Sequence, residues 1–261
     1  MYRITSLHVG TVVVEHAEPV FVWYVEGQGR KVLVDLGMPD GRMVQARWGV
    51  PGEGGGPDAL TVALAGIGVS PADIDTVLLT HLHFDHAWNI DLFPRAQVVV
   101  QREEIIHAIK PDPLQRGYFG REVNAQLISR RQPDELLIVE GDWQAAPGLA
   151  LLLCPGHTPG IQGVLVETAR GVVALASDVG EMYGNWFPAD PRATDQPRRA
   201  LRDTLLPPGI HSEAPRVCVA SMARLKERSS IVVPAHDWRI PRRMPEEWWE
   251  LPPEGAGTPG R

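Results

Sequence analysis

The fold of this 261-residue chain is decided by one short stretch, Thr80-His81-Leu82-His83-Phe84-Asp85-His86. Three imidazoles and one carboxylate lie within its last six residues. The apolar run 75–79 directly before it predicts a buried strand, and ligand-type side chains in the loop after a strand predict a metal site. A solvated, histidine-rich loop is the alternative. The Leu, Phe, Ala and Trp residues around these histidines argue against it, because unpartnered imidazoles are costly to pack among apolar side chains.

Length and composition restrict the classes of protein that remain. With 44% hydrophobic residues, the chain can bury a substantial core and suits one large domain or two closely fused halves. The net charge of -7 argues against a nucleic-acid binder. The arginine pairs at 198–199 and 242–243 are predicted to lie on solvated faces, because no basic stripe interleaved with aromatic residues surrounds them. We therefore expect no nucleic-acid partner.

The cysteines and the apolar runs bear on the compartment. Cys154 and Cys218 lie far apart in the sequence, so no disulfide framework is implied, and each is interpreted as a small buried hydrophobic residue. Residues 1–6 lack the charged and then apolar regions of a signal peptide. No apolar run approaches the roughly 18 residues of a membrane span. We expect a cytoplasmic chain without a membrane partner.

Alternating strand and helix patterns predict an α/β fold. Strands rich in β-branched residues are predicted over 11–14, 20–25, 31–35, 75–79, 96–100, 136–139, 149–153, 163–167, 172–176 and 231–233. Helices are predicted over 59–67, 102–110 and 217–228. Irregular structure is predicted over 38–57 and 111–120, and loop with short helical pieces over 187–215. The domain is predicted to span 1–245, followed by a loosely ordered tail over 246–261.

Ligand-type side chains recur at the ends of four of the predicted strands. His157 follows the strand 149–153, Asp178 follows the strand 172–176 after one intervening residue, and His236 follows the strand 231–233. One edge of a sheet sandwich can therefore gather seven ligands around two metal ions, and these are His81, His83, Asp85, His86, His157, Asp178 and His236. Nitrogen and carboxylate ligands without a thiolate suit zinc, while iron, manganese and cobalt are left open.

Other residues have two interpretations each. Asp35, at a strand end, either orients a metal ligand or is a turn aspartate. Trp48 lies either on a flap over the site or on a segment tucked against the surface. Tyr118 and Phe119 either line a substrate pocket or pack under their loop. His107, within a predicted helix, is interpreted as an ordinary helix residue.

The motif His81-Leu82-His83-Phe84-Asp85-His86, joined by His157, Asp178 and His236, resembles the signature of the metallo-β-lactamase superfamily over roughly residues 10–240. The resemblance implies an αβ/βα four-layer sandwich with a dinuclear site at one edge of the two sheets. It also implies that His81, His83 and His157 bind one ion, that Asp85, His86 and His236 bind the other, and that Asp178 bridges them. A hydroxide held between the ions would then attack the substrate carbonyl.

Within this superfamily, the segments 80–87, 154–160 and 177–178 resemble those of the quorum-quenching N-acyl homoserine lactone lactonases. In many of these a tyrosine three residues after the bridging aspartate helps to bind the lactone carbonyl. This chain has Glu181 there, and its nearest tyrosine is Tyr183. The resemblance implies a small ester or lactone substrate, with Tyr183 stabilising the oxyanion or else only packing. Asp85 would help to deliver a proton to the leaving alkoxide, and a homodimer is left open.

Three other classes of protein compete with this interpretation. A glyoxalase II-type thioesterase uses the same seven ligands and would need a basic patch for glutathione, which we do not find in the sequence. An iron-dependent oxidoreductase is the rival from another reaction class, because related folds bind iron for redox chemistry. A non-catalytic binding protein is disfavoured, since the complete ligand set would then have no role.

Overall fold

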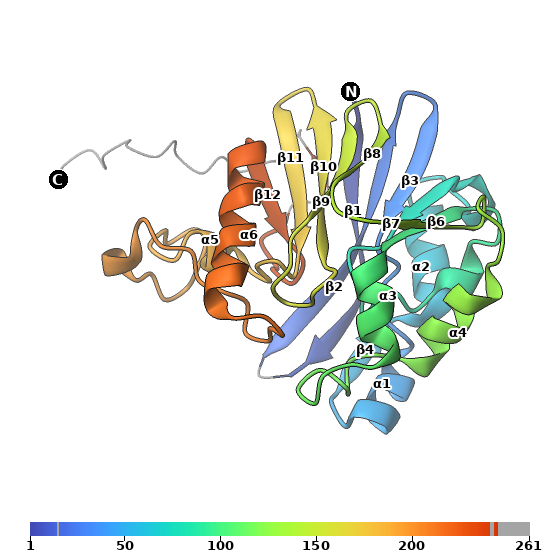
Figure 1. Ribbon diagram of the computed structural model, residues 1–261, viewed down its shortest axis with the longest axis horizontal. Coiled ribbons are helices and arrows are strands. Elements are labelled where there is room, and N and C mark those ends of the chain that lie inside the picture. The colour runs from blue at the N-terminus through green and yellow to red at the C-terminus, as the bar shows by residue number, and fades with distance from the viewer. Residues whose placement is uncertain (15, 241–242, 245–261) are drawn as a thin grey trace.

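The computed structural model of the chain consists of two β-sheets packed face to face, with helices on their outer faces (Figure 1). It describes residues 1–14, 16–240 and 243–244. The predicted tail over 246–261 and the predicted domain end at 245 lie outside the described residues. Among the described residues, no helix is both long and apolar enough to cross a membrane.

The first sheet begins as an antiparallel meander and continues as parallel strands. Its main order is β13-β1-β2-β3-β5-β6-β7, and β4 also pairs with β1. These strands are β1 (Arg3–Val13), β2 (Ala17–Gly27), β3 (Arg30–Val34), β4 (Gly52–Gly54), β5 (Thr76–Leu78), β6 (Gln97–Gln101), β7 (Leu136–Val139) and β13 (Arg243–Met244). The run of β-branched residues in each central strand suits a sheet that is covered on both faces.

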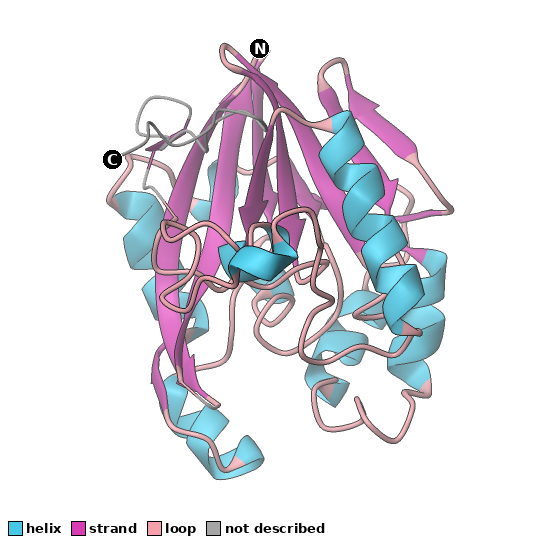
Figure 2. Ribbon diagram, turned by 90° about the vertical axis from the view of Figure 1, so that its left-hand side faces the viewer, coloured by secondary structure: helices cyan, strands magenta, loops and turns pink. Residues whose placement is uncertain are grey.

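The second sheet has the order β12-β11-β10-β9-β8. Its strands are β8 (Trp143–Ala146), β9 (Leu149–Leu153), β10 (Gln162–Thr168), β11 (Gly171–Ser177) and β12 (Ile231–Pro234). β11 and β12 are parallel, as are β3, β5 and β6 in the first sheet. Parallel neighbours end at the same edge of their sheet, and Figure 2 shows loops gathered below the strands.

Three clusters of buried apolar side chains fill the spaces between the layers. The first lies between the first sheet and its helices and includes Leu64 and Val123. The second lies between the sheets and includes Trp23 and Val164, and the third joins the second sheet to its helix through Met222. The helices are α1 (Gly41–Trp48), α2 (Gly56–Ala65), α3 (Arg102–Ile109), α4 (Arg121–Ser129), α5 (Tyr183–Trp186) and α6 (Pro215–Arg228). The predicted four-layer αβ/βα sandwich is confirmed.

The prediction of irregular structure over 38–57 is wrong, because this stretch contains α1 and β4. The Asp40 carboxylate caps α1 by accepting hydrogen bonds from the backbone N–H groups of Arg42 and Met43, each at 3.1 Å. Only Gly41 and Val44 of this helix are buried, so its apolar periodicity is weak. The glycine-rich strand β4 also lacks a strand pattern. α4 and β8 are further elements that the sequence patterns did not predict.

Candidate metal centre

The loop after β5 carries four of the seven predicted ligands. His81, His83 and His86 are each at most 2% exposed, whereas the Asp85 side chain is 14% exposed. The chain turns tightly here, because the N–H groups of His86 and Ala87 both donate to the carbonyl of His83 at 3.1 Å. The other ligands arrive singly from the second sheet. These are His157 after β9, Asp178 after β11 and His236 after β12.

The structure brings all seven side chains together in two neighbouring groups. Within each group, the candidate ligand atoms lie within 4.8 Å of one another. The first group is His81, His83, His157 and Asp178, and the second is Asp85, His86 and His236.

Asp178 lies between the two groups. Its Oδ2 is 3.3 Å from His157 Nε2 and 3.4 Å from His86 Nε2, and its Oδ1 is 3.3 Å from His236 Nε2. One carboxylate therefore contacts imidazoles of both groups, which is the position that a bridging ligand needs.

The donor atoms fit divalent metal ions. His81 Nε2 and His83 Nε2 are buried and have no hydrogen-bond partner among the described residues, although buried polar atoms almost always have one. In addition, the Nε2 atoms of His86 and His236 approach to 3.2 Å. Two ring nitrogens this close to one another need a proton or a cation between them, and imidazole with carboxylate is a ligand set that suits zinc.

Buried acceptors fix the orientation of the imidazoles from behind. Asp35 Oδ2 lies 2.8 Å from His86 Nδ1, His157 Nδ1 donates to the carbonyl of Ile210 at 2.6 Å, and His236 Nδ1 donates to that of Pro19 at 2.9 Å. With Nδ1 engaged, Nε2 of each ring faces the cluster. Of the two interpretations of Asp35, the structure therefore places it against a candidate ligand.

Asp35 also links the ends of the two sheets. It accepts hydrogen bonds from the Thr80 N–H and hydroxyl groups at 2.8 and 2.9 Å, and the Thr80 hydroxyl lies 2.8 Å from Ser177 Oγ. Asp35 and Ser177 have φ angles of 61° and 49°. Non-glycine residues rarely adopt these values, and such strain is concentrated at functional sites.

The pKa values of the imidazoles differ with their neighbours. Burial opposes the charged form of His236, but the carboxylates of Asp178 and Asp85 outweigh it and raise its pKa to about 10. For His86 burial is again outweighed by nearby carboxylates, so its pKa is raised. Burial and neighbouring histidines instead lower the pKa values of His81 and His83. These two rings are therefore neutral, the form that binds metal.

Glu104, on α3, is a residue of the site region that sequence reasoning missed. It is fully buried, and its carboxylate accepts a hydrogen bond from the Leu82 N–H at 2.9 Å and one from the Thr158 hydroxyl at 2.5 Å. It therefore ties the loop of His81 and His83 to the loop of His157. A signal was present in the sequence, because Glu104 shares a helix face with Ala108, four residues on, which is also buried.

Tyr183 and Glu181 lie differently from one another. Tyr183, the first residue of α5, is fully buried and belongs to the core between the sheets. Glu181 Oε1 lies 3.7 Å from His157 Nδ1, and its Oε2 accepts a hydrogen bond from the Gly209 N–H at 3.0 Å. Burial and the Asp178 carboxylate raise the pKa of Glu181 to about 7.

Aromatic residues cover the side of the site near His83. The Trp48 ring stacks on Phe84 at 4.2 Å, and its Nε1 donates to the carbonyl of Gly117 at 2.5 Å. The rings of Tyr118 and Phe119 lie 5.3 and 4.6 Å from that of His83. Trp48 is thus packed against the histidine loop. His107 contacts Gln115 and is in neither ligand group.

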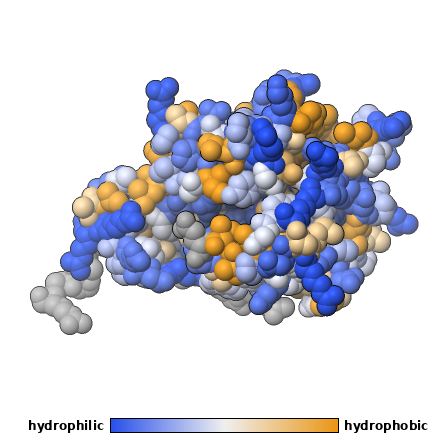
Figure 3. Space-filling model, turned by 90° about the horizontal axis from the view of Figure 1, so that it is seen from below, coloured by the Kyte–Doolittle hydropathy of each residue, from blue (hydrophilic) through white to orange (hydrophobic). Residues whose placement is uncertain are grey.

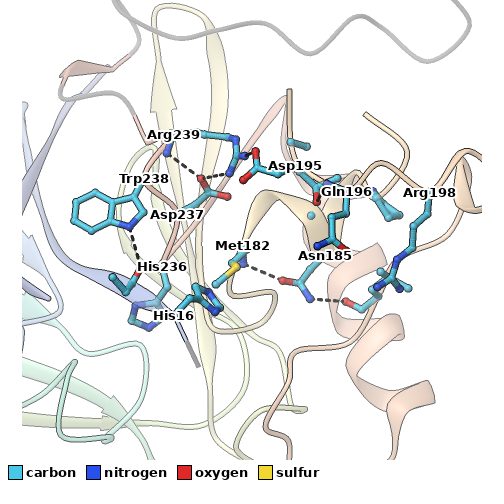
Figure 4. Close-up of a pocket in the computed structure, with 16 residues that line it drawn as sticks. His16, Met182, Asn185, Asp195, Gln196, Arg198, His236, Asp237, Trp238 and Arg239 are labelled. Atoms are coloured by element: carbon cyan, nitrogen blue, oxygen red, sulfur yellow. Dashed lines mark hydrogen bonds and ion pairs between the residues drawn. The ribbon is translucent and has the colours of Figure 1, made fainter. Parts of the chain in front are cut away.

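A cavity of about 710 Å³ adjoins His236 (Figure 4). Its walls are residues 16–17, the segment 182–198 with Leu206, and the segment 236–239. Trp238 closes one side, since its Nε1 donates to the carbonyl of Ala17 at 2.9 Å. Figure 3 shows the underside of the molecule, hollowed near its centre between hydrophilic and hydrophobic surfaces. The cavity has the size of a small-molecule site.

Comparison with known proteins agrees with this geometry. Residues 17–236 match the sequence profile of the Metallo-beta-lactamase superfamily. The chain belongs to this superfamily. It is 29% identical to the N-acyl homoserine lactonase AiiA of Bacillus thuringiensis subsp. kurstaki over 194 residues, which cover 70% of this chain and 72% of that protein. The N-acyl homoserine lactonase AiiB of Agrobacterium fabrum is 29% identical over 188 residues, or 67% of this chain and 68% of AiiB.

Solved structures show the same metallo-beta-lactamase fold. A quorum-quenching N-acyl homoserine lactone lactonase superposes with a TM-score of 0.69 at 24% identity, covering 90% of this chain and 92% of that one. A probable metal-dependent hydrolase from Staphylococcus aureus gives a TM-score of 0.66 at 19% identity, with coverages of 90% and 89%. As a member of this superfamily with lactonase relatives, the chain is an enzyme of the hydrolase class.

Proposed function

We propose that this chain is a dinuclear metal-dependent lactonase that opens the ring of an N-acyl homoserine lactone or a similar lactone. The observation that carries the proposal is the position of Asp178 between two groups of candidate ligands. The curated relatives named N-acyl homoserine lactonases support the choice of substrate. If the substrate is such a signal molecule, the biological role is quorum quenching.

We assign His81, His83 and His157 to one ion and Asp85, His86 and His236 to the other, with Asp178 shared. Two divalent ions, for which we propose zinc, would activate water at neutral pH and polarise the ester carbonyl. The supporting geometry is that each group is compact and that, in the part of the chain that the structure describes, the buried Nε2 atoms of His81 and His83 have no hydrogen-bond partner.

The side chains of the site have separate tasks in this proposal. Asp35 and the carbonyls of Ile210 and Pro19 hold three imidazoles in one orientation, so little reorganisation is needed during the reaction. Asp85 is the most exposed of the ligand carboxylates. We therefore assign it the delivery of a proton to the leaving alkoxide oxygen, in reach of solvent.

A panel of lactones, thioesters and phosphodiesters tests the proposal. Protein loaded with zinc, manganese, iron or cobalt should open lactones with the highest kcat/KM. Turnover of a thioester or phosphodiester without lactone opening would replace the substrate and leave the hydrolytic site intact. A single iron per chain in protein purified without added metal, together with no hydrolysis, would favour the oxidoreductase alternative instead.

A further inference from the structure

The loop 111–120 forms no helix or strand, yet it is hydrogen-bonded to the loop that carries His83 and to the loop that carries His157. The Phe84 N–H donates to the carbonyl of Tyr118 at 2.9 Å, and His83 forms an isolated antiparallel bridge with Phe119. From the other side, the Gln115 amide donates to the carbonyl of His157. The backbone at Tyr118 is therefore fixed relative to histidines from both sheets.

The Tyr118 side chain packs against His83, a member of the first ligand group. Its ring lies 5.3 Å from that of His83 at an interplanar angle of 34°, and the residue is only partly buried. Burial raises the pKa of the Tyr118 phenol, and the charges of Asp85, Glu181 and Glu18 raise it further. These three carboxylates come from the histidine loop, from the segment after β11 and from β2. With its ring against His83 and its side chain only partly buried, Tyr118 lies beside the first ligand group.

Tyr183 offers no such hydroxyl. It is fully buried between the sheets, and its ring is surrounded by core residues. Tyr183 is the first residue of the short helix α5. That helix is held by a hydrogen bond of 3.1 Å from the Tyr183 N–H to Asp237 Oδ2.

We propose that Tyr118, and not Tyr183, is the tyrosine that contacts the substrate, by donating a hydrogen bond from its hydroxyl to the oxygen of the scissile carbonyl. The inference rests on the proposed ester hydrolysis. As water adds to the carbonyl carbon, negative charge develops on that oxygen, and a fixed donor stabilises it. The phenol keeps its proton throughout, so no proton is transferred at this atom. Burial and the nearby carboxylates raise the pKa of Tyr118 and favour this protonated form.

The Tyr118→Phe variant tests the proposal, because it removes the hydroxyl and keeps the ring against His83. We expect kcat for lactone opening to fall about 10- to 100-fold, with unchanged metal content. Tyr183→Phe is the rival variant. Tyr24→Phe is the matched control and should keep wild-type kcat, because its hydroxyl contacts Glu26 at 3.2 Å on β2.

Each outcome decides one of the two proposals. Wild-type kcat in Tyr118→Phe would overturn the role of Tyr118, and so would a loss confined to Tyr183→Phe; both leave the lactonase proposal standing. If the wild type opens no lactone but cleaves a thioester or an aryl ester, the lactonase proposal fails and the same variants are compared with that ester. If the wild type cleaves no ester, the contact is tested by calorimetric titration of the wild type and of Tyr118→Phe with the ring-opened hydroxy acid. The variant should bind this acid at least threefold more weakly than the wild type. Equal binding would overturn the contact of Tyr118 with the substrate.

Discussion

The floor and the rim of the site are built in opposite ways. The floor consists of the seven candidate ligands, of which all but Asp85 are at most 5% exposed, and three of its histidines have a buried acceptor behind them. The rim consists of Trp48, Tyr118 and Glu181, which are partly exposed and lie on or beside irregular segments. A rigid floor suits one chemistry, whereas the rim can vary and so select the substrate. Changes to the floor should affect all substrates equally, and changes to the rim should alter the ratios between them.

The largest effect is expected for Asp178→Ala. Removing the carboxylate that contacts both ligand groups should lower kcat/KM at least about 1000-fold for every substrate. Metal content should fall below two ions per chain, as measured by elemental analysis. Glu140→Ala is the control, because the Glu140 side chain is 67% exposed and pairs with Arg102, away from both ligand groups. Full metal content with full activity would show that Asp178 is not part of the floor.

Glu104 tests whether the floor depends on support from α3. Glu104→Ala leaves the buried Leu82 N–H and Thr158 hydroxyl unpaired, so we expect a loss of about 2 to 4 kcal/mol in the free energy of unfolding in urea. We also expect kcat to fall about tenfold or more with a smaller change in KM, since the ligand loops lose their common anchor. Glu104→Gln should restore most of the unfolding free energy and of kcat. The amide oxygen can accept the hydrogen bond from the Leu82 N–H, and the amide NH2 can donate to the Thr158 hydroxyl oxygen.

Glu103 provides the control for this helix, because it directly precedes Glu104 in α3 and is exposed to solvent. Glu103→Ala should change neither quantity beyond about 0.5 kcal/mol or twofold. Equal effects of the two alanine variants would mean that the helix itself, and not the buried carboxylate, supports the ligand loops.

The rim is tested by Trp48→Leu. The variant loses the stack on Phe84 and the hydrogen bond to Gly117, so KM should rise several-fold and the kcat/KM ratio of a long-chain to a short-chain lactone should change about tenfold. Metal content should stay at the wild-type value. An equal loss for all lactones, accompanied by loss of metal, would place Trp48 in the floor.

The smallest effect is expected at the two cysteines. Both are buried and unpaired, and burial raises the pKa of Cys154 to about 12 and also raises that of Cys218. At pH 8 both thiols are therefore protonated, and the thiolate is the reactive form. A disulfide reagent such as Ellman's should titrate no thiol in the native protein and both in denaturant. Rapid native labelling would show that the structure around the floor opens.

Much of the floor could be predicted, because its residues lie in short sequence patterns that can be recognised without knowledge of distant contacts. Four ligands lie within six residues after one strand, and His157, Asp178 and His236 each follow a strand with a clear β-branched or leucine-rich pattern. Because each of these ligands follows a strand, the sequence pattern predicts that one edge of the two sheets gathers them. The structure confirms that the seven side chains are neighbours, and their metal binding stays a prediction.

Trp48 and Tyr118 of the rim, and Glu104, which supports the floor, could not be predicted in the same way. Trp48 lies in α1, a helix with little apolar periodicity that is set by the Asp40 cap. Tyr118 is positioned by backbone hydrogen bonds to distant loops, which leave no trace in side-chain spacing. Glu104 is charged and fully buried, which is contrary to the usual preference of glutamate. The positions of all three side chains depend on contacts between residues far apart in the chain.

The hydrogen bond between His236 and Pro19 has a consequence for the order of events during synthesis. The carbonyl of Pro19, which orients the last ligand, is made 217 residues before that ligand. The ribosome therefore completes the histidine loop, His157 and Asp178 long before His236 exists. A chain stalled before β12 contains every residue of the first ligand group but lacks His236 of the second, so in the proposed dinuclear site the second group would be complete only once the superfamily domain has been translated to its end.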